Sequence, residues 1–195
     1  MIKFDKNYWQ ERWANHETGW DIGYASPPIT DYIDQLANKD LKILIPGCGN
    51  AYEGQYLIQN GFANTYLIDI APGAFENLTM RFPDFPDENL ILGDFFKHEE
   101  KYDLIFEQTF FCALDPSLRQ NYAEKMHNLL KTNGKLVGVL FNEPLFEDHP
   151  PFGGSKEEYL PYFEDLFTIS HFEEAYNSIR PRSKRELFIK LEKKA

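Results

Sequence analysis

The sequence has little of what marks a disulfide-rich, metal-binding or membrane-spanning protein. It contains two cysteines, Cys48 and Cys112, and neither belongs to a Cys-x-x-Cys pair or to a cluster of cysteine and histidine. A disulfide framework and a zinc site are therefore not indicated, and we expect no bound metal. No apolar run approaches the roughly 20 residues that span a bilayer, so we expect no insertion into a membrane.

Positive charge is also scarce. The chain has 20 Lys and Arg against 31 Asp and Glu, a formal net charge of −11, which disfavours binding to nucleic acid or to an anionic membrane. The N-terminal stretch MIKFDKNYWQERW lacks the apolar core of a signal peptide, so we expect a cytoplasmic protein. We also expect a monomer whose partner is a small molecule. At 195 residues, the length predicts a single domain with a sizeable core.

One stretch, KILIPGCG at 42–49, has the pattern of a buried strand that ends in a glycine turn. Gly47 and Gly49 would let a ligand approach the backbone closely, because no side chain stands in the way. A second strand at 65–70 carries Asp69, 20 residues after Gly49, where a carboxylate is placed to accept both hydroxyls of a ribose. A tight turn between two core elements is the simpler alternative.

The turn lacks the third glycine of the dinucleotide motif G-x-G-x-x-G, because Tyr52 occupies that position. This counts against a pyrophosphate at the start of the following helix. The pattern leaves room for a nucleoside without phosphates, such as S-adenosylmethionine (SAM).

Strands and helices alternate along the middle of the chain, which predicts a Rossmann-like, doubly wound and mostly parallel sheet. Strands are expected at 43–45, 65–70, 89–93, 102–107 and 135–141, with two closing strands at 167–172 and 186–191. Because no helix separates the last two, the seven-stranded sheet should end in an antiparallel edge. Asn133-Gly134 should end the long helix that begins near Asp115. We expect this core at 42–195, preceded by a lid segment at 1–30.

All three tryptophans fall in the N-terminal segment. Trp9 and Trp13 share one face of a helix expected at 4–13, and Trp20 follows on a loop. Two interpretations stay open: the helix is fixed on the core by its large side chains, or it is a lid whose indoles wall a bound ligand. A sulfonium cation would gain cation–π attraction from such a wall.

Other candidate residues follow the ends of later strands. Asp94 is placed either to accept the amine of an adenine or to cap a local turn. Gln108 follows the fourth strand, at the edge where open α/β sheets bind ligands. The Pro- and Gly-rich loop at 142–154 is long enough to be functional, and its Phe152 is expected to border a substrate.

These pieces together resemble class I SAM-dependent methyltransferases, and most closely the thiopurine S-methyltransferase-like group, which includes plant-type thiol/halide methyltransferases. The resemblance covers nearly the whole chain. It is carried by W-x3-W-x6-W at 9–20, WDxGxxSPPI at 20–29, LIPGCG at 44–49, the long stretch DLIFEQTFFCALDPSLRQNYAEKMHNLLKTNGKL at 103–136, and PPFGG at 150–154.

The resemblance implies a SAM site. The residues that match its cofactor contacts are Trp9, Trp13, Trp20, Gly47, Gly49, Asp69, Asp94, Phe95 and Gln108. Gln108 stands where the thiopurine enzymes have arginine and the plant enzymes tyrosine, so only a backbone contact carries over. Trp20 and Tyr24 should border the methyl acceptor together with Phe152.

The leading prediction is therefore a methyltransferase for a small thiol, with halide or thiocyanate as further acceptors. The alternatives are an enzyme for another small acceptor such as a metalloid oxyanion, a NAD-dependent oxidoreductase, and a SAM-binding protein without turnover. The missing third glycine and the tryptophan segment disfavour the oxidoreductase. We assign no catalytic base, because the polar residues on the candidate loops are typical of a solvated surface.

Overall fold

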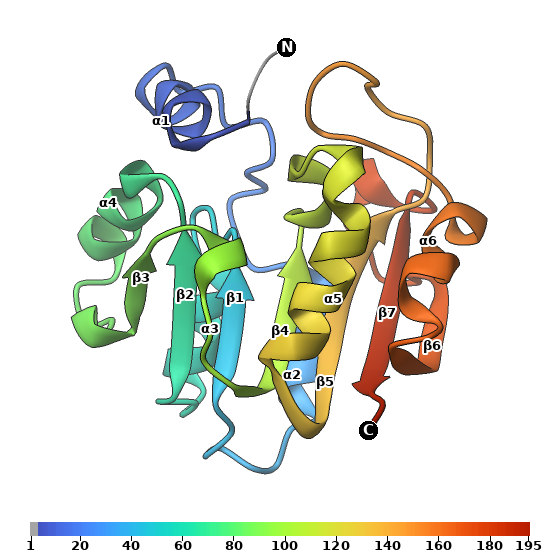
Figure 1. Ribbon diagram of the computed structural model, residues 1–195. Coiled ribbons are helices and arrows are strands. Elements are labelled where there is room, and N and C mark those ends of the chain that lie inside the picture. Colours follow the sequence, from blue (N-terminus) through green and yellow to red (C-terminus); the bar gives the residue numbers. More distant parts are fainter. Residues whose placement is uncertain (1–3) are drawn as a thin grey trace.

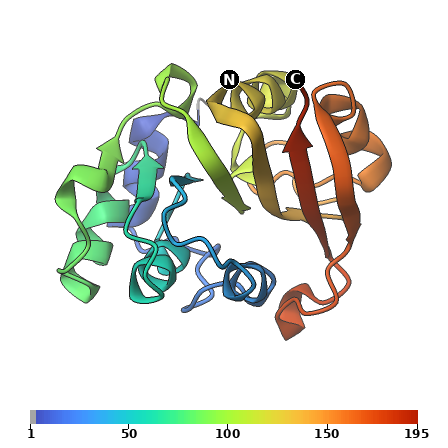
Figure 2. The ribbon, with the colours of Figure 1, turned by 90° about the horizontal axis from the view of Figure 1, so that it is seen from below.

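The computed structural model describes residues 4–195 and contains one seven-stranded sheet with helices on both faces (Figures 1 and 2). The first three residues of the predicted lid, 1–3, lie outside the described residues. The strands are β1 (Ile43–Pro46), β2 (Thr65–Asp69), β3 (Leu90–Leu92), β4 (Tyr102–Gln108), β5 (Leu130–Phe141), β6 (Phe167–Glu174) and β7 (Glu186–Lys193). The helices are α1 (Lys6–Ala14), α2 (Pro27–Asp34), α3 (Tyr52–Gln59), α4 (Pro72–Arg81), α5 (Arg119–Leu129) and α6 (Lys156–Phe163).

The strand order is β3-β2-β1-β4-β5-β7-β6. The pairs from β3 to β5 are parallel, and β7 pairs antiparallel with both β5 and β6. The predicted doubly wound sheet with an antiparallel edge is therefore confirmed.

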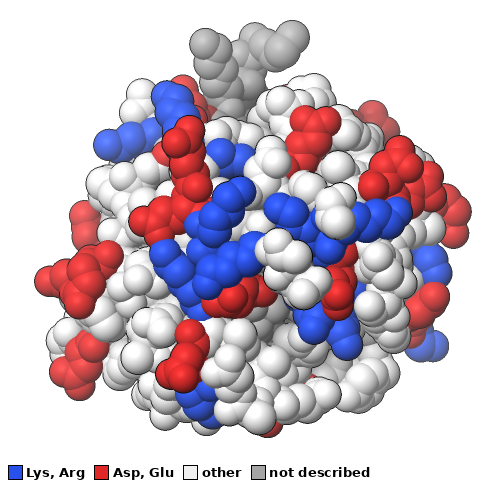
Figure 3. All heavy atoms as spheres, turned by 60° about the horizontal axis from the view of Figure 1, so that its bottom comes forward, with Lys and Arg blue, Asp and Glu red and all other residues white. Residues whose placement is uncertain are grey.

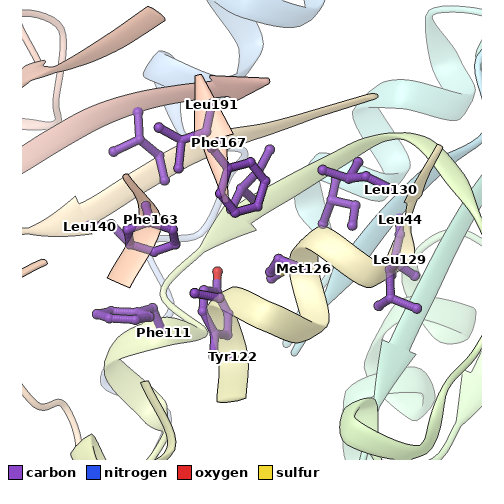
Figure 4. Close-up of a cluster of buried hydrophobic side chains, with 14 of the residues drawn as sticks. Leu44, Phe111, Tyr122, Met126, Leu129, Leu130, Leu140, Phe163, Phe167 and Leu191 are labelled. Carbon is purple, nitrogen blue, oxygen red and sulfur yellow. The ribbon is translucent and has the colours of Figure 1, made fainter. Parts of the chain in front are cut away.

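The two faces of the sheet build separate cores because successive side chains of a strand point to opposite faces. Ile43 and Ile45 pack on one face with residues of α2, α3 and α4. Leu44 packs on the other face with residues of α5 and α6. Figure 4 shows this second core, in which Tyr122 and Met126 of α5 lie among side chains of the strands.

The boundary between α5 and β5 differs from the prediction. The helix ends at Leu129, and Asn133-Gly134 lies inside β5 instead of ending the helix. Leu130 already pairs with Tyr102, and the register between β4 and β5 then shifts before Leu104 pairs with Lys135. Asn133 has φ 61°, so the Asn-Gly pair serves an irregularity of the strand. The predicted helix end at Asn133-Gly134 is therefore wrong: the pair lies at an irregular position of β5.

Lysines surround the end of α5 at the lower edge of the sheet, where Figure 3 shows basic side chains gathered on an otherwise acidic molecule. Lys193 Nζ donates to the carbonyl of Leu130 at 2.9 Å, and Lys101 Nζ donates to that of Asn128. Such contacts satisfy carbonyl groups that have no hydrogen-bond partner at a helix end. The positive charge of each lysine also interacts favourably with the negative end of the helix dipole. Among residues 4–195, no helix is both long and apolar enough to cross a bilayer.

Candidate functional site

The carboxyl ends of the parallel strands meet at the upper edge of the sheet, beneath α1 (Figure 1). The chain runs outward from β1 to β2 and β3 on one side and to β4 and β5 on the other. Such a reversal of direction opens a crevice in doubly wound sheets, and ligands bind there. The candidate site is built from the loops that follow these strands.

The glycine turn after β1 is tied to the end of β2. Gly47 (φ 56°) and Gly49 (φ 53°) are both left-handed, a conformation that glycine adopts without steric cost. The amide of Gly47 donates to the carbonyl of Ile68 at 2.8 Å, and the amide of Gly49 donates to Asp69 Oδ2 at 3.2 Å. The glycine turn and Asp69 are thus in direct contact.

Asp69 holds both loops of this edge. Its Oδ1 accepts from the amide of Ala71 at 2.9 Å, at the start of α4, while Oδ2 accepts from Gly49. Burial raises the pKa of Asp69 to about 6, although three backbone amides oppose the shift. Each carboxylate oxygen has further lone pairs, so Asp69 can accept hydroxyl donors from a ligand as well.

The three tryptophans form one cluster with Trp20 at its centre. The ring centroids of Trp20 lie 5.7 Å from Trp9 and 5.5 Å from Trp13, both edge to face. Trp13 is buried and packs on Gly73 of α4, where a Cβ would stand 2.8 Å from the Trp13 side chain. Trp20 reaches the glycine turn, since its Nε1 lies 3.4 Å from where a Cβ of Gly49 would be.

Helix α1 is also docked through polar groups. The Asp5 side chain caps its first turn by accepting from the amides of Asn7 and Tyr8. Gln10 Oε1 accepts from the amide of Gly73 at 3.1 Å, in the first turn of α4 whose amides have no helical partner. Helix α1 therefore covers the start of α4 beside the glycine turn.

A cleft of about 430 Å³ opens between α1 and the end of β3. Its lining includes Asp94 and Leu92, and also Asp5 and Lys6 of the N-terminal segment. Asp94 Oδ1 accepts from the amide of Phe96 at 2.9 Å, so the local turn cap weighed for it is present. Leu92 is 53% exposed, which leaves an apolar surface on the cleft wall next to that carboxylate.

The segment after β4 is held by a buried carboxylate. Glu107 Oε1 accepts from the amides of Phe110 and Phe111 at 2.7 and 3.0 Å, and Tyr122 donates to Oε2. Burial raises the pKa of Glu107 to about 7, against these donors. Thr109 in the same turn has φ 56°, a strained value for a β-branched residue. Glu107 thus stabilises a strained turn.

That turn delivers an aromatic side chain to the site. Phe110 lies against Gly47, and its ring centroid is 5.1 Å from that of Phe95. Phe95 itself is buried after β3. Gln108 ends β4, and its Oε1 is buried without a hydrogen-bond partner. Phe110 therefore joins the glycine turn to the residue that follows Asp94.

The loop at 142–154 has more local structure than predicted. Phe152 is buried, and its amide donates to the carbonyl of Cys112 at 2.7 Å. Isolated bridges join Glu143 to Gly154 and Phe146 to Phe152. Arg119 is stacked near Phe111 and Tyr159 and donates to the carbonyl of Gly153 at 2.7 Å. These contacts fix the loop against β4 and α5.

Of the predicted acceptor residues, Trp20 belongs to the tryptophan cluster, whereas Phe152 and Tyr24 are not among its members. Phe152 contacts Phe4, at a ring-centroid distance of 5.4 Å, and thereby borders the N-terminal segment. Tyr24 is 53% exposed and lies on the loop beyond the tryptophan cluster. Both cysteines are buried, and burial raises the pKa of the Cys48 and Cys112 thiols, so neither is a reactive thiolate.

Several residues of the site were not predicted. They are Phe110, Glu107 and Arg119. Glu107 was the one available signal: it directly follows the apolar run 104–106 in β4, and a charge in a buried strand needs partners. The others depend on contacts between distant segments.

Comparison with known proteins decides the family. The model of the thiopurine S-methyltransferase family matches residues 4–193. The chain belongs to this family. A probable thiol methyltransferase 2 of Arabidopsis thaliana is 32% identical over 77% of this chain and 69% of its own length. A thiopurine S-methyltransferase of Photobacterium profundum is 24% identical over 94% of this chain and 93% of its own.

The fold of this thiopurine S-methyltransferase family member recurs among solved methyltransferases. The 1,6-didemethyltoxoflavin-N1-methyltransferase of Burkholderia thailandensis, solved with bound S-adenosylhomocysteine, superposes with a TM-score of 0.75 over 97% of this chain and 87% of that one, at 14% identity. The family match and the methyltransferase relatives, together with this shared fold, confirm the predicted enzyme class and cofactor: the protein is a SAM-dependent methyltransferase.

The residues of this edge fit the cofactor chemically. SAM consists of an amino acid, a ribose and an adenine. The amino acid needs a bare backbone beside it, the ribose needs a carboxylate, and the adenine needs an apolar wall with a polar group at its end. The edge supplies Gly47 and Gly49, then Asp69 with free lone pairs, and then the cleft with Leu92 and Asp94. The order of these groups follows the order of the strands.

Proposed function

We propose that this enzyme transfers the methyl group of SAM to the sulfur of a small thiol. The single observation that carries the proposal is the contact between the Gly49 amide and Asp69 beside the indole of Trp20. This contact brings a bare backbone, a carboxylate and an aromatic ring to one place. The thiol methyltransferase and thiopurine S-methyltransferase relatives support sulfur as the acceptor atom.

Each predicted cofactor residue has a role in this proposal. Asp69 accepts the ribose hydroxyls, and the backbone of Gly47 and Gly49 lies along the amino-acid end. Asp94 and Phe95 meet the adenine. Trp9, Trp13 and Trp20 wall the sulfonium, which gains from aromatic faces, and Gln108 contributes through its backbone.

Trp20, Tyr24 and Phe152 border the acceptor in the same proposal. Phe152 lies between Phe4 and the carbonyl of Cys112, on the side of the site away from the adenine cleft. An apolar wall of this kind removes water from a soft anion, which makes the anion more reactive.

The chemistry asks little of acid–base groups. Bound SAM supplies an activated methyl group on a sulfonium leaving group. The protein aligns nucleophile, methyl and leaving sulfur, and positioning of this kind accounts for much of a rate enhancement. A thiol must still lose its proton, because the thiolate is the nucleophile. We assign no side chain to that proton.

A panel of acceptors with radiolabelled SAM tests the function. A small thiol, a thiopurine, iodide, thiocyanate and tellurite are compared at equal concentration. We expect the highest kcat/KM for a thiol. Methylation of tellurite alone would replace the thiol with a metalloid acceptor, and binding of SAM without transfer to any member would indicate a binding protein.

The proposal also includes the state of the protein. We propose one methyltransferase domain over 1–195, acting as a cytoplasmic monomer on a small molecule, without nucleic acid or membrane as partner. The net charge of −11 supports the last point. Size-exclusion chromatography with light scattering tests the monomer.

A further inference from the structure

A buried arginine from the far end of the chain holds the tryptophan cluster in place. Arg182 closes a short 3-10 turn, Arg180–Arg182, between β6 and β7. Its Nη2 donates to the carbonyl of Trp20 at 3.0 Å, across 162 residues of sequence. Arg182 is 8% exposed, so this charge is removed from water and needs strong partners.

The partners of Arg182 fix its orientation. Nη1 lies 3.2 Å from Glu186 Oε1, and the two side chains are 10% and 3% exposed. The guanidinium carbon lies 5.4 Å from the centroid of the Phe141 ring. One nitrogen of the planar guanidinium thus contacts Glu186, at the start of β7, and the other donates to the Trp20 carbonyl. The single ammonium group of lysine does not reproduce this geometry.

Neighbouring contacts make the segment after Trp20 a fixed connection to the core. Asp21 Oδ2 accepts from Asn50 Nδ2 at 2.8 Å, beside the glycine turn. The amide of Ser26 donates to the buried carboxylate of Glu53 at 2.8 Å. Gly19, just before Trp20, has no atom within 4 Å of where a Cβ would be. Residues 20–26 are therefore tied by side-chain contacts to the glycine turn, to α3 and to the turn before β7.

We propose that Arg182 is a positioning residue for the cofactor: by holding the Trp20 carbonyl, it keeps the indole beside Gly49 and against Trp9 and Trp13. This depends on the proposed SAM site. The indole has no polar anchor of its own among the described hydrogen bonds. Through this bond the turn between β6 and β7, which forms no part of the glycine turn, sets the position of Trp20.

The test is a double-mutant cycle on the affinity for S-adenosylhomocysteine (SAH), measured by calorimetry. Arg182→Lys should raise the Kd about tenfold, the size of one hydrogen bond to a charged group. In a Trp20→Ala background the same change should raise it less than about twofold, because coupled residues are not additive. Arg180→Gln, an exposed arginine of the same turn, is the matched control and should bind like the wild type.

A second variant tests the proposal in case Arg182→Lys does not fold. Arg182→Met with Glu186→Leu removes both charges, so no unpaired charge stays buried, and it should show the same loss of affinity. Emission of the tryptophans is a readout independent of turnover, since all three belong to this cluster. It should shift toward that of exposed indole in both Arg182 variants and stay unchanged in Arg180→Gln.

The outcomes separate this inference from the proposed function. Wild-type protein that does not bind SAH overturns the SAM site itself. Wild-type binding with an equal Kd for folded Arg182 variants overturns only the role of Arg182. Additive losses for Arg182→Lys and Trp20→Ala show that the arginine acts through something other than Trp20, and they overturn it too.

Discussion

The phenyl ring of Phe110 lies so close to the backbone of Gly47 that a Cβ added to this glycine would stand 2.2 Å from Cδ2 of the ring. The ring is held there by the turn after β4, where Glu107 accepts from the Phe110 amide. Two features therefore require glycine at position 47. The backbone is left-handed, and an aromatic ring from another strand occupies the space of the missing side chain.

Gly47→Ala should destabilise the protein by about 2–4 kcal/mol. Overpacking against the ring costs about 1–3 kcal/mol, and the left-handed backbone of an alanine adds about 1 kcal/mol. Urea denaturation measures the loss. Gly61→Ala is the matched control, because Gly61 has φ 87° and nothing within 4 Å of a Cβ, so it carries the backbone cost alone. Equal losses in the two variants would refute the contact.

SAM affinity should fall as pH drops through about 6. The ribose hydroxyls donate to the ionised form of Asp69, whose pKa is raised by burial to about 6, so protonation removes an acceptor. Asp69→Asn should bind SAM more weakly by about 1–3 kcal/mol and lose this pH dependence. Calorimetry between pH 5 and 8 checks both, and a pH-independent wild-type affinity contradicts the role.

Protein stability should change with pH in the opposite sense. The folded state binds the Asp69 proton more tightly than the unfolded chain, so this group favours folding below about pH 4 and loses that contribution as pH rises through about 6. Asp69→Asn should therefore flatten the fall in stability between pH 4 and 6. Chemical denaturation at several pH values measures it. An unchanged slope in Asp69→Asn would assign the dependence to another group, such as Glu107.

Phe152→Ala should impair use of the thiol more than binding of SAM. Phe152 is buried between Phe4 and Cys112, on the proposed acceptor side. The KM for the thiol should rise about tenfold or more, while the Kd for SAH changes less than about twofold. Phe146→Ala, in the same loop but 51% exposed, is the control. A pure loss of SAH affinity would move Phe152 to the cofactor side.

Helix α1 should become more protected when SAH binds, whereas residues 20–26 are already protected without it. Ligand contacts favour a closed lid, but the Arg182, Asn50 and Glu53 contacts hold 20–26 in either case. Hydrogen exchange with and without SAH tests this division, with α6 as the unaffected control. Equal protection of α1 in both states would make it a fixed part of the core.

Much of the fold and part of the site were predictable from local sequence. The buried run Ile43–Ile45, the glycine turn and Asp69 lie within one βαβ unit, so their relation follows from chain order and the handedness of crossovers. The Asn133-Gly134 turn was assigned to α5 because a helix end and a strand irregularity use the same residues. Periodicity does not distinguish the two.

Contacts between distant segments had no such signal. Arg182 stands in the sequence RPRSKRE, in which each basic residue is equally typical of a solvated surface. The tertiary fold, which places the turn before β7 next to the N-terminal segment, brings this arginine to the Trp20 carbonyl. In the same way, Phe110 is one of several aromatics in TFFCAL, and the strained turn at Thr109 selects which one meets Gly47.

The opposite positions of α1 and the end of β7 have a practical consequence for handling the enzyme. Helix α1 covers the carboxyl edge of the sheet, whereas β7 runs down to the other edge, where the chain ends (Figure 1). A purification tag or surface tether at the C-terminus therefore lies away from the candidate site at the carboxyl edge of the sheet. The same tag at the N-terminus adjoins the segment that we expect to open and close. Immobilised enzyme should accordingly be attached through its C-terminal end.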